Sequence, residues 1–291
     1  HGRRSLSNVE QLLRLFASMK EQYGMISLHR IMAADNDAGA RFLEKEGMRA
    51  LLPQEAPQAG EVAANRSSNI EEQVSIVTVN VDGLGEYPSS PAQRVAAILD
   101  CVLSVAPDVL HLQEVTPKMY EAAKIILSDW QVLQLKDNTH DYFPVTAIRG
   151  SAATCAVLKF GSHTEQGRHA LVARIGPWAF WNVHAESGPT ARNRDCRIWQ
   201  LELLSSRHEC DEQHVQIVAG DRNIREGEEQ CLLQQRWRDA WTTGHWNIGE
   251  NWTWRRGHSS MRFDRCYVHS SDTASADCVF MSRLCGIWDK G

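Results

Sequence analysis

The sequence predicts an α/β fold, and three observations support this fold class. Short runs rich in β-branched residues recur over 74–82, 109–112 and 215–223, and each run is typical of a buried strand. Segments with helical hydrophobic spacing follow the first two runs, over 91–103 and 117–127. Each strand-like run also leads into acids or amides, at the strand end where α/β folds place their chemistry.

The composition fits one large globular domain with a smaller piece. The chain has 291 residues, of which 43% are hydrophobic and 23% charged, and no run of about 18 apolar residues predicts a membrane span. Because the net charge is −5, any nucleic-acid contact must be local. Eight cysteines without a Cys-x-x-Cys pair argue against a zinc site and predict reduced thiols, hence an intracellular protein of the nucleus or cytoplasm. The chain begins with His1 without a signal-peptide pattern, so we expect the natural N-terminus to be missing.

Residues 1–52 predict a helix, a strand and a second helix. The block resembles the C-terminal half of a GNAT-type N-acetyltransferase, and the residues that carry this resemblance are Leu12-Leu13, Gly24, Asn36, Ala40, Phe42, Glu44-Lys45 and Gly47-Met48. In that family a glycine-rich loop holds the cofactor pyrophosphate, but Ser7 and Val9 stand at the glycine positions here. We therefore expect a remnant or an interaction segment that does not bind acetyl-CoA. Residues 53–73, rich in Pro, Gly, Ser, Ala, Gln and Glu, read as a linker to a domain over 74–291.

Polar side chains follow the predicted strands. Asn80 and Asp82 come at the end of the first strand, and Gln113-Glu114 end the second. A carboxylate at such a position can bind one hard cation through oxygen. Taken alone, Glu114 is equally well explained as an acid near a helix N-terminus, and Gly220-Asp221 as a turn with an N-cap. Three strand ends that offer oxygens or amides together favour a shared site.

Residues 129–160 predict two strands, around Trp130–Leu135 and Thr154–Phe160, and are interpreted as structural, with no chemistry. A strand over Trp178–Val183 ends at His184; a lone histidine is usually a core or surface residue, but at a strand end it suits a donor to a phosphate oxygen.

The C-terminal third offers further candidates. A helix is predicted over 190–208, and its arginines at 192, 194, 197 and 207 are interpreted as a solvated face. A short helix is expected over 228–237. Trp252 and Trp254 stand beside two arginines, and core packing or stacking on a nucleic-acid base both remain open. A last strand over 262–268 contains Asp264.

Most of the candidate residues fall in five short motifs that follow one another along the chain. They are Val79-Asn80-Val81-Asp82-Gly83-Leu84, Leu112-Gln113-Glu114-Val115, Asn182-Val183-His184-Ala185-Glu186-Ser187, Gly220-Asp221-Arg222-Asn223 and Arg262-Phe263-Asp264-Arg265. The series resembles the endonuclease/exonuclease/phosphatase superfamily over residues 74–291. That resemblance implies a four-layer α/β/β/α sandwich of two mixed sheets.

Within this superfamily, the sequence is similar to the branch that hydrolyses 5′-phosphotyrosyl bonds at DNA ends in DNA repair. The resemblance implies that Glu114, helped by Asn80, ligates Mg²⁺, with Mn²⁺ possible. It implies that Asp221 activates water, Asn223 holds that water or a phosphate oxygen, and His184 donates to another phosphate oxygen. It further implies a catalytic role for Asp264 and substrate binding by Arg225, Ser187, Trp254 and Asp82.

The C-terminus departs from the family pattern. The family ends with a Ser-Asp-His strand whose histidine pairs with the acid matching Asp264, but the chain stops at Gly291 and Ser271-Asp272-Thr273 is a poor substitute. We therefore expect a fragment lost at both ends, with reduced activity. Two alternatives remain open: the same fold acting on RNA, a phosphoinositide or another phosphodiester, and a non-catalytic binding module.

Overall fold

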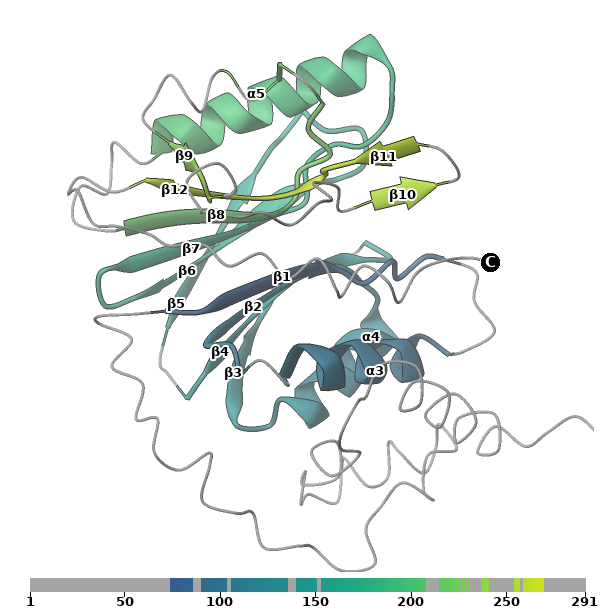
Figure 1. Cartoon of the computed structure of the whole chain (residues 1–291), viewed down its shortest axis with the longest axis vertical. Coiled ribbons are helices and arrows are strands. Elements are labelled where there is room, and N and C mark those ends of the chain that lie inside the picture. Colours follow the sequence, from purple (N-terminus) through teal and green to yellow (C-terminus); the bar gives the residue numbers. More distant parts are fainter. Residues whose placement is uncertain are drawn as a thin grey trace, which may run out of the picture.

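The computed structural model describes residues 74–269, with gaps at 86–89, 104–105, 136–139, 151–152, 208–214, 226, 229, 231–236, 241–253 and 257–258. Two β-sheets pack face to face, and helices cover the outer side of each sheet (Figure 1). The elements are β1 (Ile76–Asn80), α3 (Pro91–Leu103), β2 (Val109–Val115), α4 (Pro117–Ile126), β3 (Trp130–Leu133), β4 (Phe143–Arg149), β5 (Thr154–Lys159), β6 (His169–Ile175), β7 (Trp178–Val183), α5 (Ala191–Arg207), β8 (Val215–Asp221), β9 (Arg238–Asp239), β10 (Trp254–Arg256), β11 (Ser259–Met261) and β12 (Asp264–His269).

Both sheets are mixed. The first has the strand order β1-β2-β4-β3 and the second has the order β5-β6-β7-β8-β12-β9, while β10 and β11 form a separate two-stranded sheet. The β1–β2 pair and the β7–β8 pair are parallel, and the other pairs are antiparallel. α3 and α4 cover the first sheet and α5 covers the second (Figure 1). The predicted four-layer α/β/β/α sandwich is confirmed.

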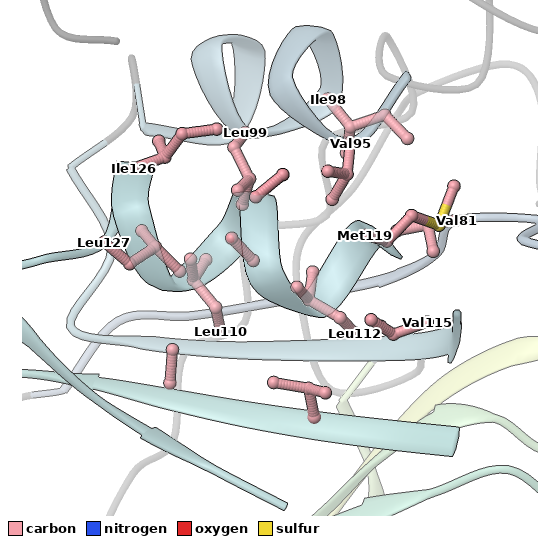
Figure 2. Packing of buried hydrophobic residues seen from close by; sticks show 14 of the residues in the cluster. Val81, Val95, Ile98, Leu99, Leu110, Leu112, Val115, Met119, Ile126 and Leu127 are labelled. Atoms are coloured by element: carbon pink, nitrogen blue, oxygen red, sulfur yellow. The ribbon is translucent and has the colours of Figure 1, made fainter. Parts of the chain in front are cut away.

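Side chains along β2 point alternately to its two faces, and this alternation explains how the layers are held together. Leu110 and Leu112 pack against α3 and α4 in the outer core shown in Figure 2, whereas Val109 belongs to the core between the sheets. β2 is buried on both faces because one face meets helices and the other meets a sheet. Burying each of these apolar side chains fully contributes roughly 1.5–3 kcal/mol. The second sheet has its own outer core under α5, which includes Leu201 and Leu204.

Some sequence predictions need correction. Two buried strands, β4 and β6, were not predicted, because β4 contains Pro144 and both are short apolar runs without a clear period. The predicted strand over 215–223 ends at Asp221, and the one predicted over 262–268 runs from Asp264 to His269. Arg197 does not lie on a solvated face, since its side chain is 1% exposed and pairs with Glu228.

Other predictions fall outside the described residues. These are the N-terminal block 1–52, the linker 53–73, most of the predicted helix over 228–237, and Ser271-Asp272-Thr273. Within the described part, Cys155 and Cys196 are free cysteines. None of the helices described is long and apolar enough to cross a membrane.

Candidate active site

The site lies where two parallel pairs of strands end, one pair from each sheet. β1 and β2 finish in Asn80 and Glu114-Val115, while β7 and β8 lead into His184 and Asp221 from the facing sheet. Gly220 makes the approach of β8 to β7 possible: a Cβ on it would lie 2.0 Å from the backbone oxygen of Val183, and its φ is +143°. Only glycine fits this position without displacing backbone.

Three residues of the site have an unusual backbone conformation. Asp82, Glu114 and Asn223 have φ values of 46°, 57° and 51°. Such left-handed conformations of residues other than glycine are uncommon, and they tend to gather at functional sites. Glu114 is the second-last residue of β2, and Asp82 and Asn223 come two residues after β1 and β8, so the backbone turns close to the ends of these strands.

Asp221 is held by amide groups from both sheets. Asn80 Nδ2 donates to Asp221 Oδ2 at 2.9 Å, and the backbone N–H of Asn223 donates to Asp221 Oδ1 at 3.0 Å. Asn80 is itself fixed, because its Oδ1 accepts from the backbone N–H of Asp82 at 2.9 Å. Asn223 Nδ2 donates to the Ala185 carbonyl at 3.2 Å. The carboxylate of Asp221 therefore has one defined orientation.

His184 faces both carboxylates. Its Nε2 lies 3.6 Å from Glu114 Oε1 and 3.8 Å from Asp221 Oδ2. Its other ring nitrogen, Nδ1, contacts Nη1 of Arg168. Since a guanidinium only donates, Nδ1 must accept and the proton sits on Nε2. Burial, with the charges of Arg168 and His169, lowers the pKa of His184 well below its ordinary value, so the ring is neutral and presents a donor to the site.

Sequence reasoning missed two residues here, Arg168 and Tyr142. Arg168 is 7% exposed, bonds Gln166 Oε1 through Nε and Nη2 at 3.1 and 2.8 Å, and lies 5.0 Å over the Tyr142 ring. Both residues come just before an antiparallel strand, β6 or β4. Antiparallel strands reach the site edge with their first residues, so a search for polar residues after strands could not find them. The interpretation of 129–160 as structural did not anticipate that Tyr142 lies beside His184 and Arg168.

Burial perturbs both carboxylates. Desolvation raises the pKa of Glu114, and the charges of Asp221 and Asp82 raise it further, against the hydrogen bond from Asn80. Desolvation likewise raises the pKa of Asp221, opposed by its bonds from Asn80 and Asn223. Several acids close together in a partly dry site favour a bound cation or a shared proton.

The oxygen donors at this point suit a hard divalent cation. Glu114 is the most accessible acid of the pair, with a side chain 20% exposed against 12% for Asp221, and a carboxylate is the ligand that Mg²⁺ prefers. Asn80 Oδ1 accepts one hydrogen bond and keeps a second lone pair. Among the described residues, no group of three or more His, Cys, Asp or Glu side chains is arranged so that it could hold a metal ion.

The remaining predicted residues are placed less directly. Asp264 pairs with Asp221 across β12 and β8, which puts the two side chains on one face. Ser187 donates both its N–H and its hydroxyl to Gln166 Oε1, at 3.1 and 2.9 Å. The backbone N–H of Arg225 donates to Glu228 at 3.0 Å, and no described hydrogen bond joins Arg225 to the acids. Trp254 is the first residue of β10.

Comparison with known proteins identifies the class to which this sandwich belongs. The model of the Endonuclease/Exonuclease/phosphatase family matches residues 77–280, and the chain belongs to this family.

Within this family, the chain is similar in sequence to individual proteins. The chain is 27% identical to tyrosyl-DNA phosphodiesterase 2 of Xenopus laevis over 58% of this chain and 47% of the relative. It is 25% identical to 5′-tyrosyl-DNA phosphodiesterase of Caenorhabditis briggsae over 68% of this chain and 60% of the relative. The chain thus spans about half of the length of these relatives.

Solved structures agree with the observed fold. A crystal structure of humanized D. rerio TDP2 with 14 mutations matches with a TM-score of 0.60 and 25% identity, over 69% of this chain and 85% of that chain. D. rerio TDP2 complexed with a single-strand DNA product matches in fold with a TM-score of 0.57 and 24% identity, over 70% and 86%.

Proposed function

We propose that this chain hydrolyses the phosphodiester bond between a tyrosyl group and a DNA 5′ end, with Mg²⁺ or Mn²⁺ as cofactor. The observation that carries the proposal is that Glu114, from one sheet, lies close to His184 and Asp221, from the other. His184 Nε2 is 3.6 Å from Glu114 Oε1 and 3.8 Å from Asp221 Oδ2. Family membership and two relatives named for tyrosyl-DNA phosphodiesterase activity support the reaction class and the substrate.

Glu114, with Asn80 Oδ1, would hold the cation. The cation supplies Lewis-acid stabilisation of charge on the phosphate and the departing oxygen. Asn80 thus has two tasks, because its Nδ2 also orients Asp221.

Asp221 takes the proton of the attacking water. Its two oxygens each accept one hydrogen bond in the structure and each retain a lone pair for that water. A raised pKa makes the carboxylate a stronger base for this purpose. Asp264, opposite Asp221 in the sheet, strengthens the negative potential around the water.

His184 and Asn223 serve the phosphate. His184 Nε2–H points toward the acids and donates to a phosphate oxygen, and Arg168 keeps that proton on Nε2. Asn223 holds the attacking water or a second oxygen. Asp82, Ser187, Arg225 and Trp254 are proposed to bind the single-stranded 5′ end.

A direct assay tests the function. The chain is incubated with a 5′-phosphotyrosyl oligonucleotide, an RNA oligonucleotide and a phosphoinositide, each with Mg²⁺ or with a chelator. We expect metal-dependent release of tyrosine from the first substrate, loss of turnover in Asp221→Asn, and normal turnover in the control Asp129→Asn, an exposed loop acid. Faster cleavage of the RNA or the lipid would refute the substrate. Binding of DNA without cleavage of any substrate would refute catalysis and favour a binding module.

A further inference from the structure

β2 carries a bulge next to its catalytic residue. Pairing with β4 passes from Leu112 opposite Val145 to Val115 opposite Phe143, so two residues of β2 stand against the single residue Pro144 of β4. Proline has no N–H to donate to the bulged strand. The second bulged residue is Glu114, whose φ is 57°. Bulges beside active sites re-aim a side chain, and this one turns Glu114 out of the sheet.

One amide from the facing sheet satisfies this bulge. Asn182 of β7 donates through Nδ2 to the carbonyls of Val145 and Leu112, at 2.8 and 3.3 Å. Its Oδ1 accepts from Gln113 Nε2 at 2.8 Å. Both amide side chains are fully buried. Asn182 therefore uses both ends of its side chain on the bulged segment of the other sheet.

The position of these bonds links them to the chemistry. Gln113 immediately precedes Glu114, and Asn182 lies two residues before His184. Apolar contacts between the sheets tolerate sliding, whereas hydrogen bonds are directional. Near the catalytic groups, hydrogen bonds between the two sheets include the Asn80–Asp221 contact and the bonds of Asn182 to Gln113, Leu112 and Val145.

We propose that Asn182 is a positioning residue of the active site. It holds the β2 bulge against β7 and so sets the distance between Glu114 and the His184–Asp221 pair. The catalytic consequence rests on the proposed function, but the structural role of Asn182 at the bulge does not.

A matched control exists at the other end of the sandwich. Gln131 of β3 also forms a two-way amide bridge, to Ala153, which immediately precedes β5 of the other sheet: its Nε2 donates to the Ala153 carbonyl at 2.9 Å, and its Oε1 accepts from the Ala153 N–H at 2.6 Å. Gln131 pairs near the end of β4, opposite Ile148, whereas the bulge lies near the start of that strand. Losing either bridge removes similar hydrogen bonds, but only one lies beside the catalytic groups.

The test compares Asn182→Ala and Asn182→Ser with Gln131→Ala, all in the full chain. Hydrogen exchange of the amides of 113–115 is followed by mass spectrometry without metal. Turnover of the 5′-phosphotyrosyl oligonucleotide is measured at a temperature where circular dichroism shows every variant folded. We expect exchange about tenfold faster and kcat about 10- to 100-fold lower in the Asn182 variants, with KM within about threefold, since misplacement by about 1 Å costs on the order of 10²-fold. Gln131→Ala should change neither measurement by more than about twofold.

Two results would overturn the proposal. The first is unchanged exchange at 113–115 in the Asn182 variants, and the second is an equal loss of kcat in Gln131→Ala, which would make the effect one of general stability. If the parent chain does not cleave the oligonucleotide, the proposed function fails, and the exchange measurement still decides whether Asn182 holds the bulge. A serine that keeps parental exchange and kcat would also count against the proposal, since its hydroxyl is too short to reach the carbonyls.

Discussion

Replacing Gly83 by alanine tests whether the 82–85 loop sets the position of Glu114. A Cβ on Gly83 would lie 1.9 Å from the backbone oxygen of Glu114 and 2.9 Å from Thr116 Cγ2. Ordinary contact begins at about 3.4 Å, so the loop and the end of β2 must separate by about 1.5 Å (3.4 − 1.9). Arg94 resists this movement, because it bonds the carbonyls of Asp82 and Gly83 at 3.0 and 3.1 Å.

The expected magnitudes follow from that displacement. A shift of about 1 Å at a catalytic group costs on the order of 10²-fold in rate, and overpacking costs roughly 1–3 kcal/mol of stability. The assay is kcat on the phosphotyrosyl oligonucleotide together with a urea melt. Gly176→Ala is the control: Gly176 has φ +51° with open space around its Cβ position, so alanine should cost about 1 kcal/mol without altering kcat. If Gly83→Ala lost only as much activity as Gly176→Ala, Glu114 would not depend on this contact and the argument would be wrong.

Four further predictions concern charge and ligands. In metal-free buffer, Asp221→Asn should raise the melting temperature at pH 7. Burial raises the pKa of Asp221, so the folded state loses stability as pH rises toward that raised pKa, and an uncharged asparagine avoids this loss. A gain in melting temperature that persisted below about pH 3, where Asp221 is protonated in both the folded and the unfolded form, would contradict this. Arg197→Met should lower the free energy of unfolding by about 3–5 kcal/mol, because it removes the guanidinium that pairs with the buried Glu228. Adding Glu228→Met should recover most of this loss in urea melts. If the costs of the two substitutions were additive, the pairing argument would be refuted. Glu114→Gln should stay folded and lose several orders of magnitude of Mg²⁺-dependent turnover, and near-normal turnover would remove it from the metal site. Calorimetric titration of the whole chain with acetyl-CoA should show no binding through residues 1–52, and saturable micromolar binding would reverse that interpretation.

Much of the site could be predicted from the sequence because parallel strands end at a common edge. Asn80, Glu114, His184 and Asp221 each lie at or next to the C-terminal end of a strand, and the structure brings these four together. Strand periodicity and the polar residues after it are local features, so they can be read along the chain. The roles of these residues, and those of Asp82, Ser187, Asn223, Arg225, Trp254 and Asp264, stay predictions until the assays are done.

The α/β class, the order of the motifs and the candidate acids and amides of the site could be predicted from the amino-acid sequence alone. Three contacts became apparent only in the folded protein: Arg168 fixes the proton of His184, Tyr142 lies beside them, and Asn182 bonds the β2 bulge. These contacts join segments 16 to 70 positions apart in the chain. They depend on how two sheets stack and on which antiparallel strands start at the site edge, and neither has a local signal in the sequence.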